Sequence, residues 1–203
     1  MRRHVTTIVL AGTLAVSLAT LAMAWRGPGN NRGYAPVQPI SFSHRLHAGD
    51  MKIACVYCHG GVETSRYAGI PAMSTCMNCH RNVTMSFAAQ QQANPVESPE
   101  LRKLYDALAL DKALKPIAGQ APKSIAWKKV HQLPDFVYFD HRAHITASVT
   151  CQTCHGPVET MDRMRQFESL SMGWCVNCHR DATLKGIAGK PVHASTDCTT
   201  CHY

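Results

Sequence analysis

The five-residue motif Cys-x-x-Cys-His occurs five times in this 203-residue chain and uses all ten of its cysteines. The motifs, numbered 1 to 5 in chain order, lie at residues 55–59, 76–80, 151–155, 175–179 and 198–202. Two thiols three positions apart can each add to a vinyl group of one porphyrin, and the adjoining imidazole can then bind the iron. We therefore expect five covalently attached haems c. Their thioethers would come from Cys55, Cys58, Cys76, Cys79, Cys151, Cys154, Cys175, Cys178, Cys198 and Cys201, and their proximal iron ligands would be His59, His80, His155, His179 and His202.

Other uses of paired cysteines fit this pattern poorly. Zinc binds Cys-x-x-Cys pairs and histidines, but it gives no reason for a histidine directly after every second cysteine. A thioredoxin-like redox pair needs one such motif in one domain, not five. No cysteine is left over for a disulfide.

Composition and charge agree with an interior made largely of cofactor. Five haems leave only about forty residues each, so the haems must lie nearly in contact, and aromatic residues make up only 7% of the chain. The formal charge of +8 falls to about +3 if each ferric haem with two ionised propionates counts as about −1. We therefore expect many Lys and Arg side chains to balance propionates, and we expect no nucleic-acid partner.

The N-terminus predicts a membrane segment. Arg2 and Arg3 precede residues 5–25, which are uncharged and mostly apolar until Trp25. This stretch is longer than the apolar core of a usual signal peptide and predicts a transmembrane anchor with the haem region on the periplasmic side of a bacterial inner membrane. The alternative is a signal peptide cleaved after Ala24. A Gly- and Asn-rich linker follows at residues 27–33.

The haem region contains an internal duplication. Phe-x-His-x-x-His at residues 42–47 precedes motif 1, and the same pattern at residues 139–144 precedes motif 3. Gly-x-Val-Glu-Thr follows each of these motifs, and a second Cys-x-x-Cys-His-Arg follows later. Such detailed self-similarity predicts two repeated units with two haems each, and a fifth haem at the C-terminus.

The histidines before motifs 1 and 3 are candidate distal ligands. A low-spin electron-transfer haem needs a second strong axial ligand. Phe-x-His-x-x-His leading into Cys-x-x-Cys-His resembles the class III multihaem cytochromes, whose haems have two histidine ligands. The resemblance implies that His44 caps the iron bound by His59 and that His141 caps the iron bound by His155. It also implies that His47 and His144 reach other haems of the cluster.

The fifth haem needs a distal ligand from elsewhere, and we consider three candidates. Met172 is favoured because a thioether is a known haem ligand that raises the reduction potential, and Gly173 would let the backbone turn towards a haem. The alternative for Met172 is simple packing against a porphyrin, as expected for the equivalent Met73. His131, in the aromatic stretch that leads to His141, is the second candidate, although it could instead bind a propionate. His193 is the third, and it has no counterpart in the repeat.

The expected fold is mostly helical and irregular, organised by haems into two pseudo-repeated lobes behind an N-terminal transmembrane helix. Between the two units, Ser98 as N-cap, Pro99 in the first turn and apolar residues at helical spacing predict one amphipathic helix that ends before Pro116. The expected segments are 1–25 (anchor), 26–40 (linker), 41–95 (first unit), 96–125 (helical connector) and 126–203 (second unit with three haems).

The arrangement of the whole chain resembles the pentahaem subunit of bacterial alternative complex III. The resemblance rests on the N-terminal anchor, the five motifs, Met-Gly-Trp-Cys at residues 172–175 and an aromatic, basic stretch at residues 127–139. It implies electron transfer within a membrane complex that oxidises quinol. Partners would include an iron-sulfur subunit, and a cytochrome c or terminal oxidase would accept the electrons.

Two other functional classes remain open. An independent anchored or periplasmic cytochrome would use the same haems as an electron shuttle. A multihaem reductase enzyme would need an open haem, often with Lys in place of the proximal His, whereas every motif here ends in His. We therefore expect no catalytic residue in this chain.

Overall fold

The computed structural model describes residues 11–21 and 30–203, in which short helices alternate with irregular segments. The helices are η1 (Arg45–Asp50, a π-helix), α2 (Cys55–Cys58), η2 (Gly60–Val62, 3-10), α3 (Met73–His80), α4 (Phe87–Gln90), α5 (Pro99–Ala107), α6 (His141–Thr146), α7 (Cys151–His155), η3 (Val158–Thr160, 3-10), α8 (Met172–Lys185) and α9 (Cys198–Cys201). Within the described residues, β-structure is limited to isolated bridges, such as Val137 with His202. The mostly helical, irregular fold class is confirmed.

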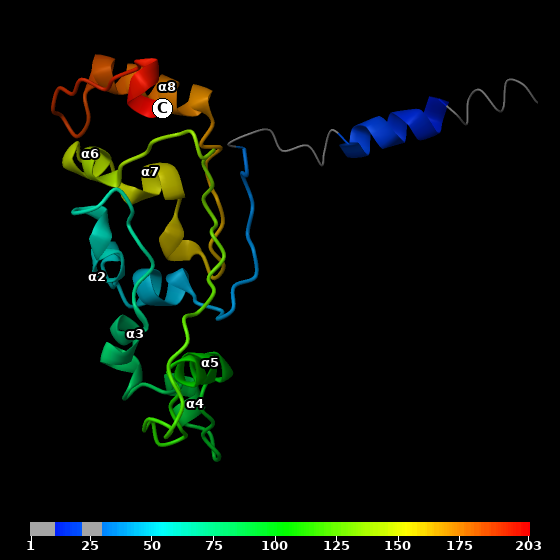
Figure 1. The fold of residues 1–203 in the computed structure, drawn as a ribbon, viewed down its shortest axis with the longest axis vertical. Coiled ribbons are helices and arrows are strands. Elements are labelled where there is room, and N and C mark those ends of the chain that lie inside the picture. Colours follow the sequence, from blue (N-terminus) through cyan, green and yellow to red (C-terminus); the bar gives the residue numbers. More distant parts are fainter. Residues whose placement is uncertain (1–10, 22–29) are drawn as a thin grey trace, which may run out of the picture.

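Residues 11–21 form a helix that is exposed along its whole length and stands apart from the rest of the chain (Figure 1). Across residues 11–21 and 30–203, no helix has the length and apolar character needed to cross a membrane. The predicted segment 5–25 lies partly outside the described residues.

The helices that carry the motifs succeed one another along the long axis of the molecule (Figure 1). α4 and α5 lie at one end, followed by α3, α2 and α7, and α8 lies at the other end with the C-terminus. Irregular segments run beside this column and bind one another. Gly33 N donates to Gln166 O at 2.8 Å, and Gln38 Nε2 donates to Lys128 O at 2.9 Å.

The sequence duplication is repeated in the order of the helices. In each unit, a helix at the Phe-x-His-x-x-His segment (η1, which begins after His44, or α6, which begins at His141) precedes a short helix that opens at the first motif cysteine (α2 or α7). A 3-10 turn follows, and then a helix begins at a methionine three residues before the next motif (α3 at Met73, α8 at Met172). The same local sequences therefore give the same order of helices in both units, although η1 is a π-helix and α6 an α-helix.

A close backbone approach joins the two units at η1 and η3. Gly49 is buried, and a Cβ on it would collide with the backbone carbonyl of Glu159. Only glycine fits at such a contact, so Gly49 lets the helix before motif 1 pack against the turn after motif 3.

The predicted connector helix is present as α5. Ser98 is its N-cap residue and Pro99 its first residue, although the Ser98 side chain makes no capping hydrogen bond, and the helix ends at Ala107, well before Pro116. Leu104 and Tyr105 are buried. The Tyr105 hydroxyl donates to the backbone carbonyl of His80 at 2.6 Å, so this helix packs beneath motif 2.

The buried apolar core of the described residues is very small. It consists of Val62, Leu104, Tyr105, Ala109, Met161 and Ala182. Large apolar side chains are instead exposed in or beside the motifs, among them Leu46, Val56, Tyr57 and Phe136. A chain of this size normally buries far more apolar surface, so the distribution fits a fold whose interior is porphyrin.

Candidate haem-binding site

Each motif places its two cysteines on one turn of helix. The residues before α2, α7 and α9 (Ala54, Thr150 and Asp197) are extended, and the first cysteine opens the helix. Residues three apart on a helix lie on the same face. Both thiols of a motif therefore point to the same side, as attachment to one porphyrin requires.

Three pairs of imidazoles face each other at the separation that a haem iron needs. Metal–imidazole bonds of about 2 Å on both sides of an iron put the two ring centres about 6 Å apart. The ring centroids of His47 and His80 are 6.1 Å apart, and those of His144 and His179 are 6.0 Å apart. His141 and His155 are 6.4 Å apart with an interplanar angle of 4°. Each pair joins a candidate distal histidine to a motif histidine.

The phenylalanine of Phe-x-His-x-x-His holds both histidines that follow it. Phe42 meets His44 edge-on at 4.9 Å and stacks on His47 at 4.3 Å. Phe139 meets His141 edge-on at 4.8 Å and lies 4.6 Å from His144. The phenylalanine of each segment therefore separates the two histidine rings that follow it, and these two rings have different neighbours. The sequence showed the phenylalanine as part of the repeat but not its contact with both rings.

Most of these imidazoles are anchored through Nδ1. Nδ1 of His47 and His144 donates to the carbonyl four residues earlier, Ser43 O and Asp140 O, at 2.9 Å in both cases. Nδ1 of His141 donates to Arg66 O at 2.9 Å, and the motif rings His59, His80 and His179 donate to Gly69 O, Val83 O and Ser195 O at 2.7, 2.8 and 2.6 Å. A proton on Nδ1 leaves the lone pair on Nε2 for iron.

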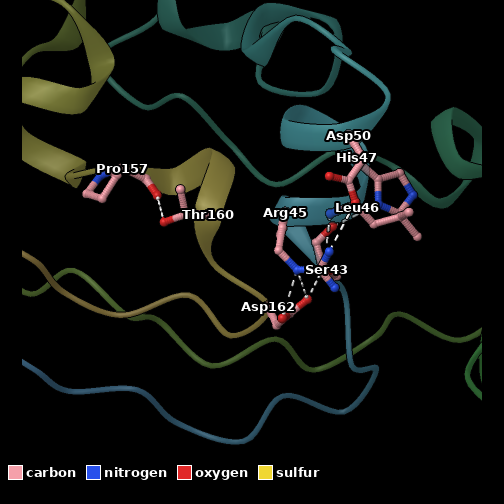
Figure 2. Close-up of polar contacts among 8 residues, drawn as sticks. All are labelled: Ser43, Arg45, Leu46, His47, Asp50, Pro157, Thr160 and Asp162. Carbon is pink, nitrogen blue, oxygen red and sulfur yellow. Dashed lines mark hydrogen bonds and ion pairs between the residues drawn. The ribbon is translucent and has the colours of Figure 1, made fainter.

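In each unit, the segment that carries the candidate distal histidines contacts the residues after the central motif of the other unit. In Figure 2, Ser43 and Arg45, at the start of η1, both bind Asp162, which follows motif 3: Ser43 Oγ donates at 2.7 Å and Arg45 Nε at 3.0 Å. In return, His141 of the second unit binds the carbonyl of Arg66, which follows motif 1. The distal segment of each unit is thus fixed by the loop of the other.

Electrostatic interactions between neighbouring thiols indicate the order of the motifs in space. Motif 1 lies next to motif 2. After burial, the charge of the Cys79 thiol of motif 2 is the largest cause that raises the pKa of Cys58 in motif 1. Burial and then Cys55, by charge and by a hydrogen bond, raise the pKa of Cys151. Burial and then Cys178 raise the pKa of Cys154 to about 11.

After burial, the charge of the Cys201 thiol is likewise the largest cause that raises the pKa of Cys175. The motifs therefore follow one another as 2, 1, 3, 4 and 5, which is the order of α3, α2, α7 and α8 along the molecule (Figure 1).

The donor set fits haem iron. Burial lowers the pKa of His44 to about 4 and that of His155 to about 3, which keeps these imidazoles neutral, as metal ligation requires. Within residues 11–21 and 30–203, no group of three or more His, Cys, Asp or Glu side chains gathers around a point that could hold a bare metal ion. A porphyrin supplies four nitrogens itself, so paired imidazoles suffice.

Two buried polar atoms lack a partner in the described structure, namely His44 Nδ1 and Arg66 Nε. The Arg66 guanidinium lies between the rings of Tyr67 and Tyr138, at 4.8 and 4.3 Å. A cationic nitrogen that is shielded from water and has no acceptor favours a nearby anion, and a haem propionate has the required charge. Neither the orphaned nitrogen nor the aromatic sandwich could be predicted from the sequence.

The residues considered for the fifth distal position lie in different surroundings. His202 of motif 5 faces Phe136 with ring centroids 5.7 Å apart. Met172 is 66% exposed at the start of α8, whereas the equivalent Met73 is half-buried. His193 makes no hydrogen bond or ring contact within the described part of the chain. Nε2 of His131 lies 3.1 Å from Nδ1 of His155 and not opposite a motif histidine ring at iron-binding distance.

Comparisons with known proteins point to the same chemistry. Residues 137–203 match the family described as cytochrome c7 and related cytochrome c, and residues 75–156 match the family described as cytochrome c554 and c-prime. Each match covers less than half of the chain. Cytochromes c carry covalently attached haem, so the matches agree with the attachment motifs.

Two relatives come from Nitratidesulfovibrio vulgaris (strain Hildenborough). The multiheme cytochrome c subunit of menaquinone reductase is 25% identical over 185 residues, which cover 81% of this chain and 76% of that protein. The high-molecular-weight cytochrome c is 25% identical over 187 residues, which cover 73% of this chain and 33% of that protein. This chain thus spans about a third of the second relative. Both relatives are named as cytochromes c, and the first is named as a multiheme subunit.

Proposed function

We propose that this chain, a relative of multihaem c-type cytochromes, is an electron-transfer subunit that conducts electrons through five covalently attached haems c. The observation that carries the proposal is the set of three imidazole pairs with ring centres 6.0 to 6.4 Å apart. An iron held by two strong axial ligands stays low-spin and reorganises little on reduction, which suits electron transfer and not substrate binding.

The geometry supports a specific pairing of proximal and distal ligands. His155 pairs with His141, His80 with His47, and His179 with His144. His44 pairs with His59, whose charge is the largest cause after burial that lowers the pKa of His44. Met172 remains our candidate for the haem of motif 5, because the two repeated histidine pairs are then fully used.

The order of the motifs defines a path for electrons. Motifs 1 and 3 lie at the centre, where the equivalent residues Cys55 and Cys151 meet. Motif 2 lies at one end, above α5, and motifs 4 and 5 lie at the other end near the C-terminus (Figure 1). We propose that electrons enter and leave at the haems of motifs 2 and 5. The two repeated units then form two lobes that meet between the haems of motifs 1 and 3.

We further propose that the chain works inside a membrane complex. The relative with the larger coverage is named as a subunit of a menaquinone reductase, which favours fixed partners over free diffusion. The partners would be an iron-sulfur subunit and quinone-reactive membrane subunits. A cytochrome c or terminal oxidase would accept electrons, and the haem region would lie on the periplasmic side of the bacterial inner membrane. The chain itself would be a conductor, because catalysis at the quinone would belong to the complex.

The direction of the current has two candidates. The resemblance to alternative complex III favours electrons that leave a quinol and flow towards a cytochrome c or an oxidase. The name of the relative, a menaquinone reductase subunit, favours the opposite flow, from a periplasmic donor towards quinone. A row of haems conducts both ways, so the potentials of the partners decide.

Purification of the tagged chain from membranes in mild detergent tests this function. We expect it to copurify with other subunits, one of which gives an iron-sulfur signal by electron paramagnetic resonance (EPR). A menaquinol analogue should then reduce the haems of the complex but not those of the isolated chain. Oxidation of pre-reduced haems by the matching quinone would identify the reverse direction.

The remaining classes predict different outcomes. A chain that purifies alone, with all haems low-spin, would be an independent electron shuttle. Carbon monoxide binding by the reduced holoprotein, together with a high-spin signal, would indicate an open haem and a reductase.

A further inference from the structure

His155 of motif 3 differs from the other anchored motif histidines in the partner of its Nδ1. His59, His80 and His179 each bind a backbone carbonyl. His155 Nδ1 instead lies 3.1 Å from Nε2 of His131, a side chain 24 residues away, and the two rings cross at 82° with centroids 4.4 Å apart. When Nε2 of His155 binds iron, its Nδ1 must carry the ring proton, and Nε2 of His131 is then the acceptor of this hydrogen bond.

We infer that His131 is a positioning residue for the haem of motif 3: its Nε2 accepts the Nδ1–H of His155, which fixes that ligand and lowers the reduction potential of its iron. This inference rests on the proposed haem at motif 3. It also assigns His131 a role other than fifth distal ligand, because the nitrogen that would bind iron is used for the hydrogen bond.

Buried polar contacts hold His131 in place. The backbone N–H of the next residue, Gln132, donates to Oε1 of Gln166 at 3.2 Å. Gln166 is fully buried, and its Nε2 donates to the carbonyls of Glu168 and Ser169 at 3.0 and 3.2 Å. The Gln132 side chain in turn accepts from Asn31 Nδ2 at 3.1 Å. The segment before the second unit is therefore fixed where His131 meets His155.

The chemistry of the acceptor decides the direction of the effect. A hydrogen bond from the second nitrogen of a ligating histidine raises the basicity of the ligand. An imidazole nitrogen is a stronger base than a peptide carbonyl, so His155 gains more imidazolate character than the other motif histidines. A more basic ligand stabilises ferric over ferrous iron. The haem of motif 3 should accordingly have a lower potential than it would with a carbonyl acceptor.

Two substitutions at one position test this. His131→Phe keeps a planar ring but removes the acceptor, and His131→Gln restores an acceptor oxygen on a flexible side chain. In spectroelectrochemical titrations of the holoprotein, we expect His131→Phe to shift one haem of five towards ferrous iron. The expected shift in its equilibrium is about tenfold, equivalent to about 59 mV for one electron. His131→Gln should recover part of this shift, and the EPR signature of one low-spin haem should change in His131→Phe alone.

Other outcomes would overturn the inference. Unchanged potentials in His131→Phe with all five haems retained would show that the hydrogen bond does not tune the iron. A new high-spin haem in His131→Phe would show that His131 is itself an axial ligand. Loss of one haem from the mass of the wild-type protein would instead contradict the proposed function, so the two failures are distinguishable.

A measurement on the wild-type protein covers the case in which the variants do not mature. In the fully reduced, diamagnetic holoprotein labelled with ¹⁵N-histidine, NMR should detect a coupling through the hydrogen bond between His155 Nδ1 and His131 Nε2. A spectrum that resolves both rings and shows no such coupling would contradict the inference.

Discussion

The two repeated units of this chain share a sequence pattern but differ in what surrounds the histidines that we propose as their central haem ligands. In the second unit, His141 is anchored by the carbonyl of Arg66, whereas Nδ1 of the equivalent His44 is buried and has no partner in the described structure. The motif histidines differ as well, since His59 is held by a carbonyl and His155 by another imidazole.

The comparison separates two tasks in building a haem site. The repeated residues, namely the phenylalanine, the two histidines and the following motif, set where the ligands lie, and they do so in the same way in both units. The groups that orient each ligand come from outside the repeat. Two sites with one pattern can therefore have different electronic properties, and the following predictions test this difference.

Removal of a distal histidine should produce the largest effect. We expect His141→Ala to leave one haem high-spin while all porphyrins stay attached, because thioether bonds do not depend on the axial ligand. His44→Ala should do the same to a different haem, and the double variant should contain two high-spin haems. EPR and optical spectra of the ferric protein measure this. A low-spin spectrum in either single variant would remove that histidine from the ligand set and break the equivalence of the units.

The equivalent methionines Met172 and Met73 should behave differently. Met172 is exposed and Met73 is half-buried. If the thioether of Met172 binds the fifth iron, one haem should titrate at a clearly higher potential than the others. Met172→His should lower this potential and keep the haem low-spin, while Met73→Ala should leave all five haems low-spin. Unchanged potentials in Met172→Ala would place the ligand elsewhere, and His193 would then be tested.

The contact between the units depends on Gly49 and not on its counterpart Thr146. In Gly49→Ala, the added methyl group would collide with the carbonyl of Glu159. Overpacking of this kind lowers the free energy of unfolding by about 1–3 kcal/mol. Thr146 is exposed, so Thr146→Ala should change the free energy of unfolding by less than about 0.5 kcal/mol. Denaturant unfolding of the two holoproteins gives the comparison. Equal stabilities would show that the η1–η3 contact is not tight.

The smallest effect is expected for Asp140, which precedes His141, the first candidate distal histidine of the second unit. Asp140 caps α6 by accepting from Arg142 N at 2.9 Å, and a hydrogen bond from the Arg142 side chain is the main cause that lowers the pKa of Asp140 from 3.8 to about 2. A lowered carboxyl pKa stabilises the fold above the ordinary value of 3.8, and this contribution is lost as the pH falls through about 2.

Asp140→Ala should therefore lower Tm clearly at neutral pH and by much less at about pH 2, where the carboxyl group is partly protonated. The equivalent Ser43 has no charge of its own, but it donates to the Asp162 carboxylate and helps to lower the pKa of Asp162, so the effect of Ser43→Ala should also decrease in acid. A decrease in Tm for Asp140→Ala that is the same at both pH values would contradict the role of the carboxylate.

The sequence predicted what short motifs encode and missed what the tertiary structure adds. The attachment motifs, the duplication and the helix around Leu104 and Tyr105 were readable because each depends on residues close in sequence. The carbonyl of Arg66 against His141 and the ring of His131 against His155 join residues 75 and 24 positions apart. The first contact leaves no pattern in the sequence, because any residue can supply a carbonyl. The second depends on how the fold brings residue 131 to residue 155.

The order of the motifs shows the same limit. Chain order would place motif 2 between motifs 1 and 3, whereas in the structure motifs 1 and 3 are neighbours through Cys55 and Cys151. Contacts of Ser43 and Arg45 with Asp162, which follows motif 3, accompany this arrangement. A local motif carries no information about such contacts.

Mass spectrometry of the denatured, fully matured protein tests the central claim most directly, because it counts the porphyrins that are bound by thioethers. The account predicts one species that carries five haem additions, with no free thiol that can be alkylated. A mature protein with four or fewer haems, or with alkylatable cysteines in any of the five motifs, would contradict it.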